Sequence, residues 1–96
     1  MVFRLKFKPA SSKDLYKISK KNKELGALII NRIIPEILKE PFLGRIKQGD
    51  LKKIRSKNFD FNGISYRILY EIEAEIVRIY AIGVHDTAYR KAKSRR

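Results

Sequence analysis

The sequence predicts an α+β fold in a single domain over residues 1–96. An N-terminal strand comes first, then two helices forming a helical hairpin, then a three-stranded antiparallel meander. Residues 2–8 alternate apolar and basic, residues 15–38 hold apolar residues at helical spacing, and Asn62-Gly63 joins two alternating segments. Because each helix carries one apolar stripe, we expect both helices to pack on one sheet face.

The first strand is predicted over Val2–Lys8, with apolar residues on one side and basic residues on the other. Pro9 ends this strand, since proline has no backbone N–H to donate. Ser11 and Ser12 then offer hydroxyl groups of the kind that cap helix N-termini, and an early Asp14 suits the helix dipole. The first helix is therefore predicted to start near Ser11.

Helical spacing continues to Leu38, either as a pair of helices or as one long broken helix. Gly26 is the predicted break, and Pro41 is the predicted end of the helical region. Pro35 lies inside the second helix, where its missing N–H should kink or weaken a turn. The basic stretch 42–53 is predicted to be a loop.

Asn62-Gly63 is a strong signal for a two-residue hairpin turn, and such a turn sets the pairing of its strands. Asn58 then faces Arg67, and Asp60 faces Ser65. The face expected to form the core carries Phe59, Phe61, Ile64, Tyr66, Ile68, Tyr70 and Ile72. The face expected to stay open and polar carries Asn58, Asp60, Ser65, Arg67, Leu69 and Glu71.

The last strand is predicted to follow a short acidic turn and to end at Gly83. Its predicted core-facing residues are Val77, Ile79 and Ala81, and its predicted residues on the polar face are Arg78, Tyr80 and Ile82. His85 and Tyr89 are four residues apart and would share one side of a closing turn or helix. Residues 91–96 form a basic C-terminal tail that we expect to fray.

The chain is strongly basic, with 23 Lys+Arg against 10 Asp+Glu and a net charge of +13. This favours a polyanionic partner: a nucleic acid, the ribosome, an acidic protein or an anionic membrane. The absence of Cys excludes disulfides and thiolate chemistry, and a lone His excludes a histidine-rich zinc site. No apolar run reaches the roughly 18–20 residues of a membrane span and no signal peptide is recognisable, so we expect a cytoplasmic protein.

Three groups are needed to cleave RNA without a metal: a base for the 2′-OH, a cation for the charged phosphorane and an acid for the leaving 5′-oxygen. Arg67 suits the cation role, because a guanidinium meets two phosphate oxygens and stays charged. His85 suits the acid or base role. The basic residues expected to grip phosphates are Lys47, Lys52, Lys53, Arg55, Lys57, Arg78 and Arg90.

The segment Tyr66-Arg-Ile-Leu-Tyr-Glu-Ile-Glu73, together with residues 76–85 and Tyr89-Arg90, resembles the C-terminal half of the RelE/ParE superfamily toxins of type II toxin–antitoxin modules. The Asn-Gly turn ahead of Tyr-Arg is similar to RelE-like members in particular. The first half of the chain matches in pattern only. This resemblance implies the RelE-like microbial RNase fold, with mRNA and the ribosome as partners and no cofactor. It also implies a cognate antitoxin that silences the toxin in a hetero-oligomeric complex.

The same resemblance implies that Arg67 stabilises the reacting phosphate. It places His85 where some members carry an arginine and others a histidine regarded as the general acid. Tyr89 falls where members carry an aromatic residue that stacks on a base or assists the acid.

The general base is the open question of the resemblance. A lysine pair of RelE aligns with Asn58 and Asp60, so that pair is missing here. Asp60 is one candidate base, and Lys57 is another if the strand register slips.

Two other functions stay open. ParE-like relatives share the fold but poison DNA gyrase by binding it, and they typically lack an acid–base set; His85 with Tyr89 argues against this. A decayed toxin that only binds nucleic acid is the third reading, which the Asn58 and Asp60 substitutions keep open.

Overall fold

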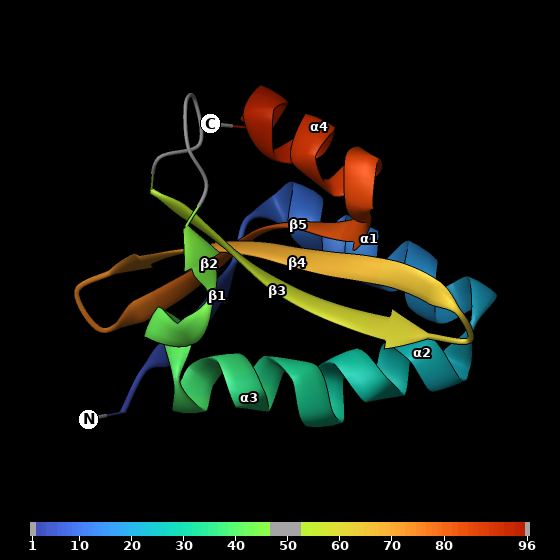
Figure 1. Ribbon diagram of the computed structural model, residues 1–96, viewed down its shortest axis with the longest axis horizontal. Coiled ribbons are helices and arrows are strands. Elements are labelled where there is room, and N and C mark those ends of the chain that lie inside the picture. The colour runs from blue at the N-terminus through green and yellow to red at the C-terminus, as the bar shows by residue number, and fades with distance from the viewer. Residues whose placement is uncertain (1, 47–52, 96) are drawn as a thin grey trace.

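The computed structural model describes residues 2–46 and 53–95, without the side chains of His85, Asp86 and Tyr89. Within these residues a five-stranded mixed sheet has the order β1-β5-β4-β3-β2 (Figure 1). Its strands are β1 (Arg4–Phe7), β2 (Arg45–Ile46), β3 (Ile54–Phe61), β4 (Ile64–Glu73) and β5 (Ile76–Val84). The helical elements are α1 (Pro9–Lys21), α2 (Lys23–Leu28), the π-helical turn η1 (Ile29–Ile33), α3 (Ile34–Lys39), the 3-10 turn η2 (Pro41–Leu43) and α4 (His85–Arg95).

The predicted α+β class is confirmed, as is the antiparallel meander β3-β4-β5. The N-terminal strand β1 joins the sheet beside β5 and runs parallel to it. The short strand β2 was not predicted and pairs antiparallel with the start of β3. Two residues are too few to show a strand period, so this element has no signal in the sequence.

Helix α1 begins at Pro9, two residues before the predicted start. Proline is favourable at this position, because its absent N–H would have no partner in the first helical turn. Ser11 does not cap the helix; it is buried, and its hydroxyl lies 2.8 Å from the carbonyl oxygens of Lys8 and Ile79. That hydroxyl therefore ties α1 to β5.

The helical region divides at Asn22 and not at the predicted Gly26. Asn22 leaves the helical conformation, and its side-chain oxygen accepts a hydrogen bond of 3.1 Å from the N–H of Leu25. Gly26 lies inside α2, where an added Cβ would come within 2.2 Å of the Ser19 Oγ. The glycine thus permits close approach of α1 and α2.

The disturbance predicted at Pro35 is present as the π-helical turn η1. The N–H of Ile34 bonds to the carbonyl of Ile29, five residues back. Pro35 then falls in the first turn of α3, where a missing N–H is tolerated. The helix therefore continues past the proline towards Pro41, as predicted for its end.

The predicted hairpin register is confirmed, with Asn58 opposite Arg67 and Asp60 opposite Ser65. Asn62 and Gly63 have φ values of 51° and 78°, as a type I′ turn requires. The predicted core face packs against α1, α2 and α3, although Ile64 at the hairpin tip is exposed. The buried residues of this large core are Leu25, Ile29, Ile33, Ile34, Ile37, Ile68, Tyr70, Val77, Ile79 and Ile82.

Strand β5 contains a β-bulge that the sequence pattern did not reveal. Leu69 faces Ala81 whereas Tyr70 faces Ile79, so Tyr80 has no residue opposite it. Beyond the bulge Ala81 lies on the second face and Ile82 lies in the large core, the reverse of the prediction. All the residues around the bulge are apolar or aromatic, so alternation gave no warning.

Helix α4 covers the sheet face that was predicted to stay open, on the side away from α2 and α3 (Figure 1). The two predicted helices do pack on one face, but the prediction that the other face stays open is wrong. The fraying predicted for the basic tail is also wrong for residues 91–95, which form the last turns of α4. A second, smaller core lies under this helix, and its members are Ile54, Leu69, Tyr80, Ala81, Ala88 and Ala92.

Candidate active site

Arg67 lies in the middle of β4, the central strand of the sheet. Its neighbour Ile68 is fully buried in the large core, so alternation points Arg67 to the face that carries α4. The residues directly opposite are Asn58 on β3 and Gly83 on β5. Arg67 is partly buried. A rigid strand therefore holds a permanent positive charge beside a position that has no side chain.

The bulge at Tyr80 is what sets Gly83 opposite Arg67. If β5 continued regularly from the Tyr70–Ile79 pair, Ile82 would take that place. A Cβ at Gly83 would lie 3.8 Å from the backbone nitrogen of Ala88 and 3.9 Å from the Cγ2 of Thr87. The first turn of α4 thus lies close above the glycine.

Helix α4 starts two residues after Gly83. Its N-terminal N–H groups carry a partial positive charge, which adds to that of Arg67 at this end of β4 and β5. The backbone of His85 opens the helix and that of Tyr89 follows one turn later, as the sequence predicted. The side chains of both residues lie outside the described part of the structure.

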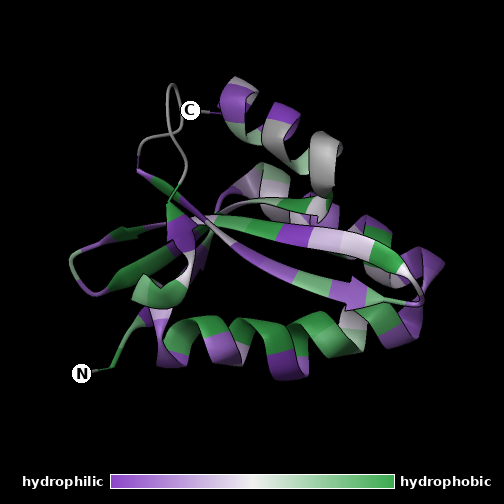
Figure 2. Ribbon diagram, in the orientation of Figure 1, coloured by the Kyte–Doolittle hydropathy of each residue, from purple (hydrophilic) through white to green (hydrophobic). Residues whose placement is uncertain are grey.

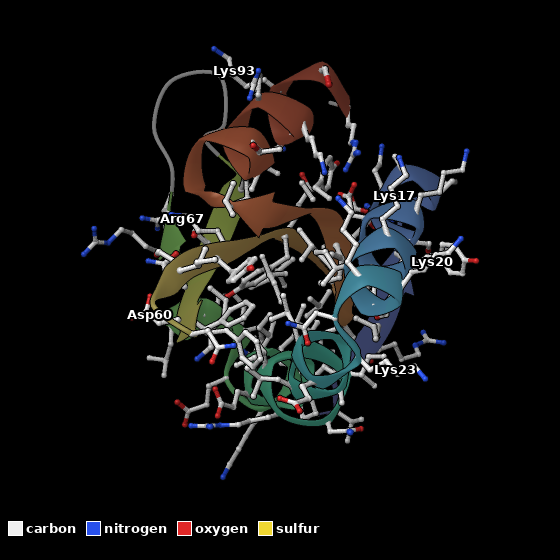
Figure 3. All side chains as sticks on the ribbon, turned by 90° about the vertical axis from the view of Figure 1, so that its right-hand side faces the viewer. Lys17, Lys20, Lys23, Asp60, Arg67 and Lys93 are labelled. Carbon is white, nitrogen blue, oxygen red and sulfur yellow. The ribbon has the colours of Figure 1, made fainter. Side chains whose placement is uncertain are left out.

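Asp60 is exposed on β3 and shares the sheet face of Arg67, one cross-strand pair nearer the hairpin turn. Arg67 and Asp60 lie on the same side of the molecule, opposite Lys17, Lys20 and Lys23 (Figure 3). The structure therefore brings the candidate base to the same end of the sheet as the candidate cation.

Asn58 on β3 lies opposite Arg67 and two residues before Asp60. Its side chain accepts a 2.6 Å hydrogen bond from the Ser56 hydroxyl. This bond fixes the amide that faces Arg67 across the strand pair. Neutral Asn58 and acidic Asp60 thus occupy the β3 positions on the sheet face of Arg67.

The predicted phosphate-binding residues do not form one surface. Arg55 lies on the sheet face that α3 covers, away from Arg67. It donates 3.0 Å hydrogen bonds to the carbonyls of Phe42 and Gly44. Lys57 also points to that face and forms a 3.1 Å ion pair with Glu36. The register does not slip, so Lys57 is not brought to Arg67 as a base.

Arg78 lies at the far end of β5, where it contacts Glu71 at 3.4 Å and Glu73 at 3.5 Å. Lys53 at the start of β3 and Arg90 on α4 are exposed. Lys47 and Lys52 lie outside the described residues. Of the five predicted phosphate contacts that the structure describes, Lys53 and Arg90 are therefore the exposed ones.

A cleft of about 550 Å³ lies elsewhere, between α3 and the outer edge of β3. Its walls carry both signs of charge, including Glu36, Glu40 and Arg45, and Arg67 is not part of them. Of the residues around Arg67, Asn58 also lines this cleft.

The model of the family described as "ParE-like toxin of type II bacterial toxin-antitoxin system" matches residues 8–93. The chain belongs to this family. It is a toxin of a type II toxin–antitoxin system with a RelE-like fold. No curated protein matches its sequence.

Two solved structures share the fold of this toxin. The RelBE2 toxin–antitoxin complex from Mycobacterium tuberculosis contains a chain that is 20% identical, with a TM-score of 0.70 over 88% of this chain and 100% of that one. A free variant of E. coli RelE with two arginines replaced by alanine is 18% identical, with a TM-score of 0.72 over 99% and 98%. The resemblance to the RelE/ParE superfamily is thereby confirmed.

In the described part of the toxin no helix is long and apolar enough to cross a membrane.

One group of polar residues in the toxin was missed by the sequence analysis. Asp14 of α1 is only 5% exposed and accepts hydrogen bonds from Lys91 and Arg95, both on α4. The available signal was the position of Asp14 four residues before Ile18, on the inward side of α1. Its partners are 77 and 81 residues away along the chain, and no spacing rule connects them.

Proposed function

We propose that this toxin is a metal-independent endoribonuclease that cuts mRNA on the ribosome until its antitoxin neutralises it. The observation that carries the proposal is Arg67, which the central strand holds opposite Gly83 and beside the start of α4. A phosphate that approaches Arg67 at this end of the sheet meets a guanidinium and the positive end of a helix. The likeness in fold to E. coli RelE supports the same class of activity.

The proposed reaction is attack of a ribose 2′-OH on its own phosphate, with departure of the 5′-oxygen of the next nucleotide. Arg67 stabilises the charge that develops on the phosphorane, which is usually the largest contribution at such sites. His85 on α4 donates the proton to the leaving 5′-oxygen, and Asp60 takes the proton of the 2′-OH. Tyr89 on α4 stacks on a base next to the cut.

The charge of the toxin supports a polyanionic substrate. A net charge of +13 attracts RNA and speeds its association, and exposed Lys53 and Arg90 extend the contact to neighbouring phosphates. The ribosome would supply part of the positioning of the mRNA. We place the activity in the cytoplasm, where a cognate antitoxin binds the toxin in a hetero-oligomeric complex.

The test is primer extension on a defined mRNA after brief induction of the toxin. Wild-type protein should create discrete new 5′ ends within the translated region, and Arg67→Ala should abolish them. Arg32→Ala is the matched control, because it removes an exposed arginine from the other side of the sheet and should leave cleavage intact. Cleavage that survives Arg67→Ala would contradict the assignment.

A second candidate function is a non-enzymatic inhibitor of DNA gyrase. One observation favours it: the matching family model is that of ParE-like toxins. Growth arrest with intact mRNA, and inhibition of supercoiling by purified gyrase, would establish it. Intact mRNA with normal growth would instead indicate a decayed nucleic-acid-binding module.

A further inference from the structure

Among the described residues, the carboxylate of Asp14 is buried and accepts the most hydrogen bonds. Arg95 donates from Nη1 to Oδ2 at 2.7 Å and from Nη2 to Oδ1 at 3.2 Å. Lys91 Nζ donates to Oδ1 at 2.9 Å, and the backbone N–H of Ile82 donates to Oδ2 at 3.2 Å. One carboxylate from α1 thus binds two cations of α4 and the backbone of β5.

Neighbouring contacts extend the same connection. Arg95 also donates a 2.9 Å hydrogen bond to the carbonyl of Tyr80, the bulged residue of β5. Lys8 donates to the carbonyl of Arg95 at 3.3 Å and lies 4.8 Å from the centre of the Tyr80 ring. The C-terminal end of α4 is therefore bound to the N-terminal end of α1 across the edge of β5.

The apolar contact that the described side chains of α4 make with the sheet is small. Among its described side chains, α4 contributes two to the second core, Ala88 and Ala92. Figure 2 shows the ribbon of α2 and α3 mostly hydrophobic, whereas the coloured part of α4 is mostly hydrophilic. Because two methyl groups bury little area, the polar contacts of Asp14 must supply much of the attachment of α4.

The two ends of α4 make different contacts. Lys91 and Arg95, in the C-terminal half, bind Asp14, whereas Thr87 and Ala88, in the N-terminal half, lie close to Gly83. A helix is stiff over this length, so fixing its far end limits where its near end lies. Asp14 reaches β5 at Ile82, one residue before the Gly83 that faces Arg67, and its partner Lys91 has its Nζ 4.0 Å from where a Cβ of Gly83 would lie.

We propose that Asp14 is a positioning residue whose carboxylate holds α4 on the sheet and thereby holds the N-terminal turn of α4 beside Arg67. The catalytic consequence rests on the proposed RNase function, whereas the attachment of α4 does not. Loss of the carboxylate releases α4 and leaves the sheet and the helices α1 to α3 folded. Gly83, opposite Arg67, then loses its helical cover.

The test compares full-length wild-type toxin with Asp14→Asn, which removes the charge and keeps the size. Glu24→Gln is the matched control, because Glu24 is an exposed acid on α2. Amide hydrogen exchange of α4 should become about tenfold faster or more in Asp14→Asn, while exchange in β4 stays as in wild type. Equal protection of α4 in the two proteins would overturn the proposal, as would equal loss of protection in α4 and β4.

The catalytic consequence has its own readout. RNA cleavage by Asp14→Asn should fall about 10- to 100-fold in kcat, because the groups of α4 are no longer held beside Arg67. An unchanged kcat with faster exchange in α4 would refute the link between attachment and activity. A wild-type protein that cuts no RNA would refute the proposed function and leave the exchange experiment to decide about Asp14.

Arg95→Gln provides a second route if Asp14→Asn does not fold. It removes a donor from α4 without changing α1, and it should also accelerate exchange in α4 relative to β4. The two substitutions together should have less than the sum of their single effects, because both act on one contact. Additive effects would contradict a shared role.

Discussion

The two faces of the central sheet are covered by helices that are held in different ways. On one face, α2, η1 and α3 bury large aliphatic side chains such as Ile29, Ile33 and Ile37. On the other face, α4 packs two alanines against the sheet and relies on Asp14 for its attachment. Stability is therefore concentrated on the first face, and the second face can hold charged groups that a dense core would exclude.

Strand β4 belongs to both faces and shows the contrast between adjacent residues. Ile68 is fully buried in the large core, and Arg67 points to the opposite face with Asn58 and Gly83 across from it. Because the first face fixes the strand, the position of Arg67 does not depend on its own contacts.

The largest expected effect on stability comes from the first face. Ile68→Ala should lower the free energy of unfolding by about 2–5 kcal/mol, because it leaves a cavity in a fully packed core. Urea denaturation measures this change. Arg67→Ala is the partner experiment: its unfolding midpoint should stay near that of wild type while cleavage is lost. A large destabilisation by Arg67→Ala would remove the distinction between the faces.

The second prediction concerns Asp14 and pH. Burial raises the pKa of Asp14, but hydrogen bonds from the α4 cations and from the Ile82 N–H outweigh it, so the pKa lies below its ordinary value of 3.8. A lowered folded pKa means that the carboxylate stabilises the fold above the unfolded pKa, and this stability is lost as pH falls through the folded pKa. Asp14→Asn should therefore cost roughly 1.5–3 kcal/mol at neutral pH.

Urea denaturation at neutral pH and at several values below pH 3.8 tests this dependence. The difference between wild type and Asp14→Asn should shrink as pH falls, because the wild-type carboxylate becomes protonated. A difference that is the same at every pH would show that the ionised form has no special part in the contact.

A smaller effect is expected from Tyr70, which is buried in the large core and donates a 2.5 Å hydrogen bond to the carbonyl of Pro41. Tyr70→Phe keeps the ring and removes the bond, so stability should fall by about 0.5–1.5 kcal/mol. Thermal unfolding followed by circular dichroism measures it. Cleavage by this variant should match wild type, because Tyr70 lies on the face away from Arg67.

The smallest effect is expected from the ion pair between Lys57 and Glu36. Both side chains are substantially exposed, so water screens their attraction. Lys57→Ala should leave both the melting temperature and RNA cleavage unchanged within error. A clear loss of cleavage would mean that Lys57 reaches the substrate and that the two faces do not separate structure from function.

The parts of the fold that the sequence could predict are those with local causes. Asn62-Gly63 fixes a turn type, and this turn alone set the correct pairing of Asn58 with Arg67. The placement of Gly83 opposite Arg67 was not predictable in the same way. It depends on a bulge among apolar residues, where no alternation distinguishes one register from another.

The prediction that the second face stays open was wrong for a related reason. The basic residues near the C-terminus read as a frayed tail, but Lys91 and Arg95 find an acid that lies far away in the chain. Tertiary contacts of this kind supply the partner that local composition lacks. The position of Arg67 on the sheet was predictable because it depends on strand period, whereas its helical cover depends on Asp14.

The bulge at Tyr80 also determines how β5 tolerates changes in chain length. Every other residue from Ile76 to Val84 has a partner across from it on β4, so Tyr80 is the position whose deletion would leave all existing pairs in register. A deletion or insertion between Ala81 and Val84 would instead move Gly83 away from Arg67 and shift the start of α4. When β5 is aligned with a strand that lacks a bulge, the gap belongs at Tyr80, because an ungapped alignment would displace Gly83, His85 and Tyr89 by one position.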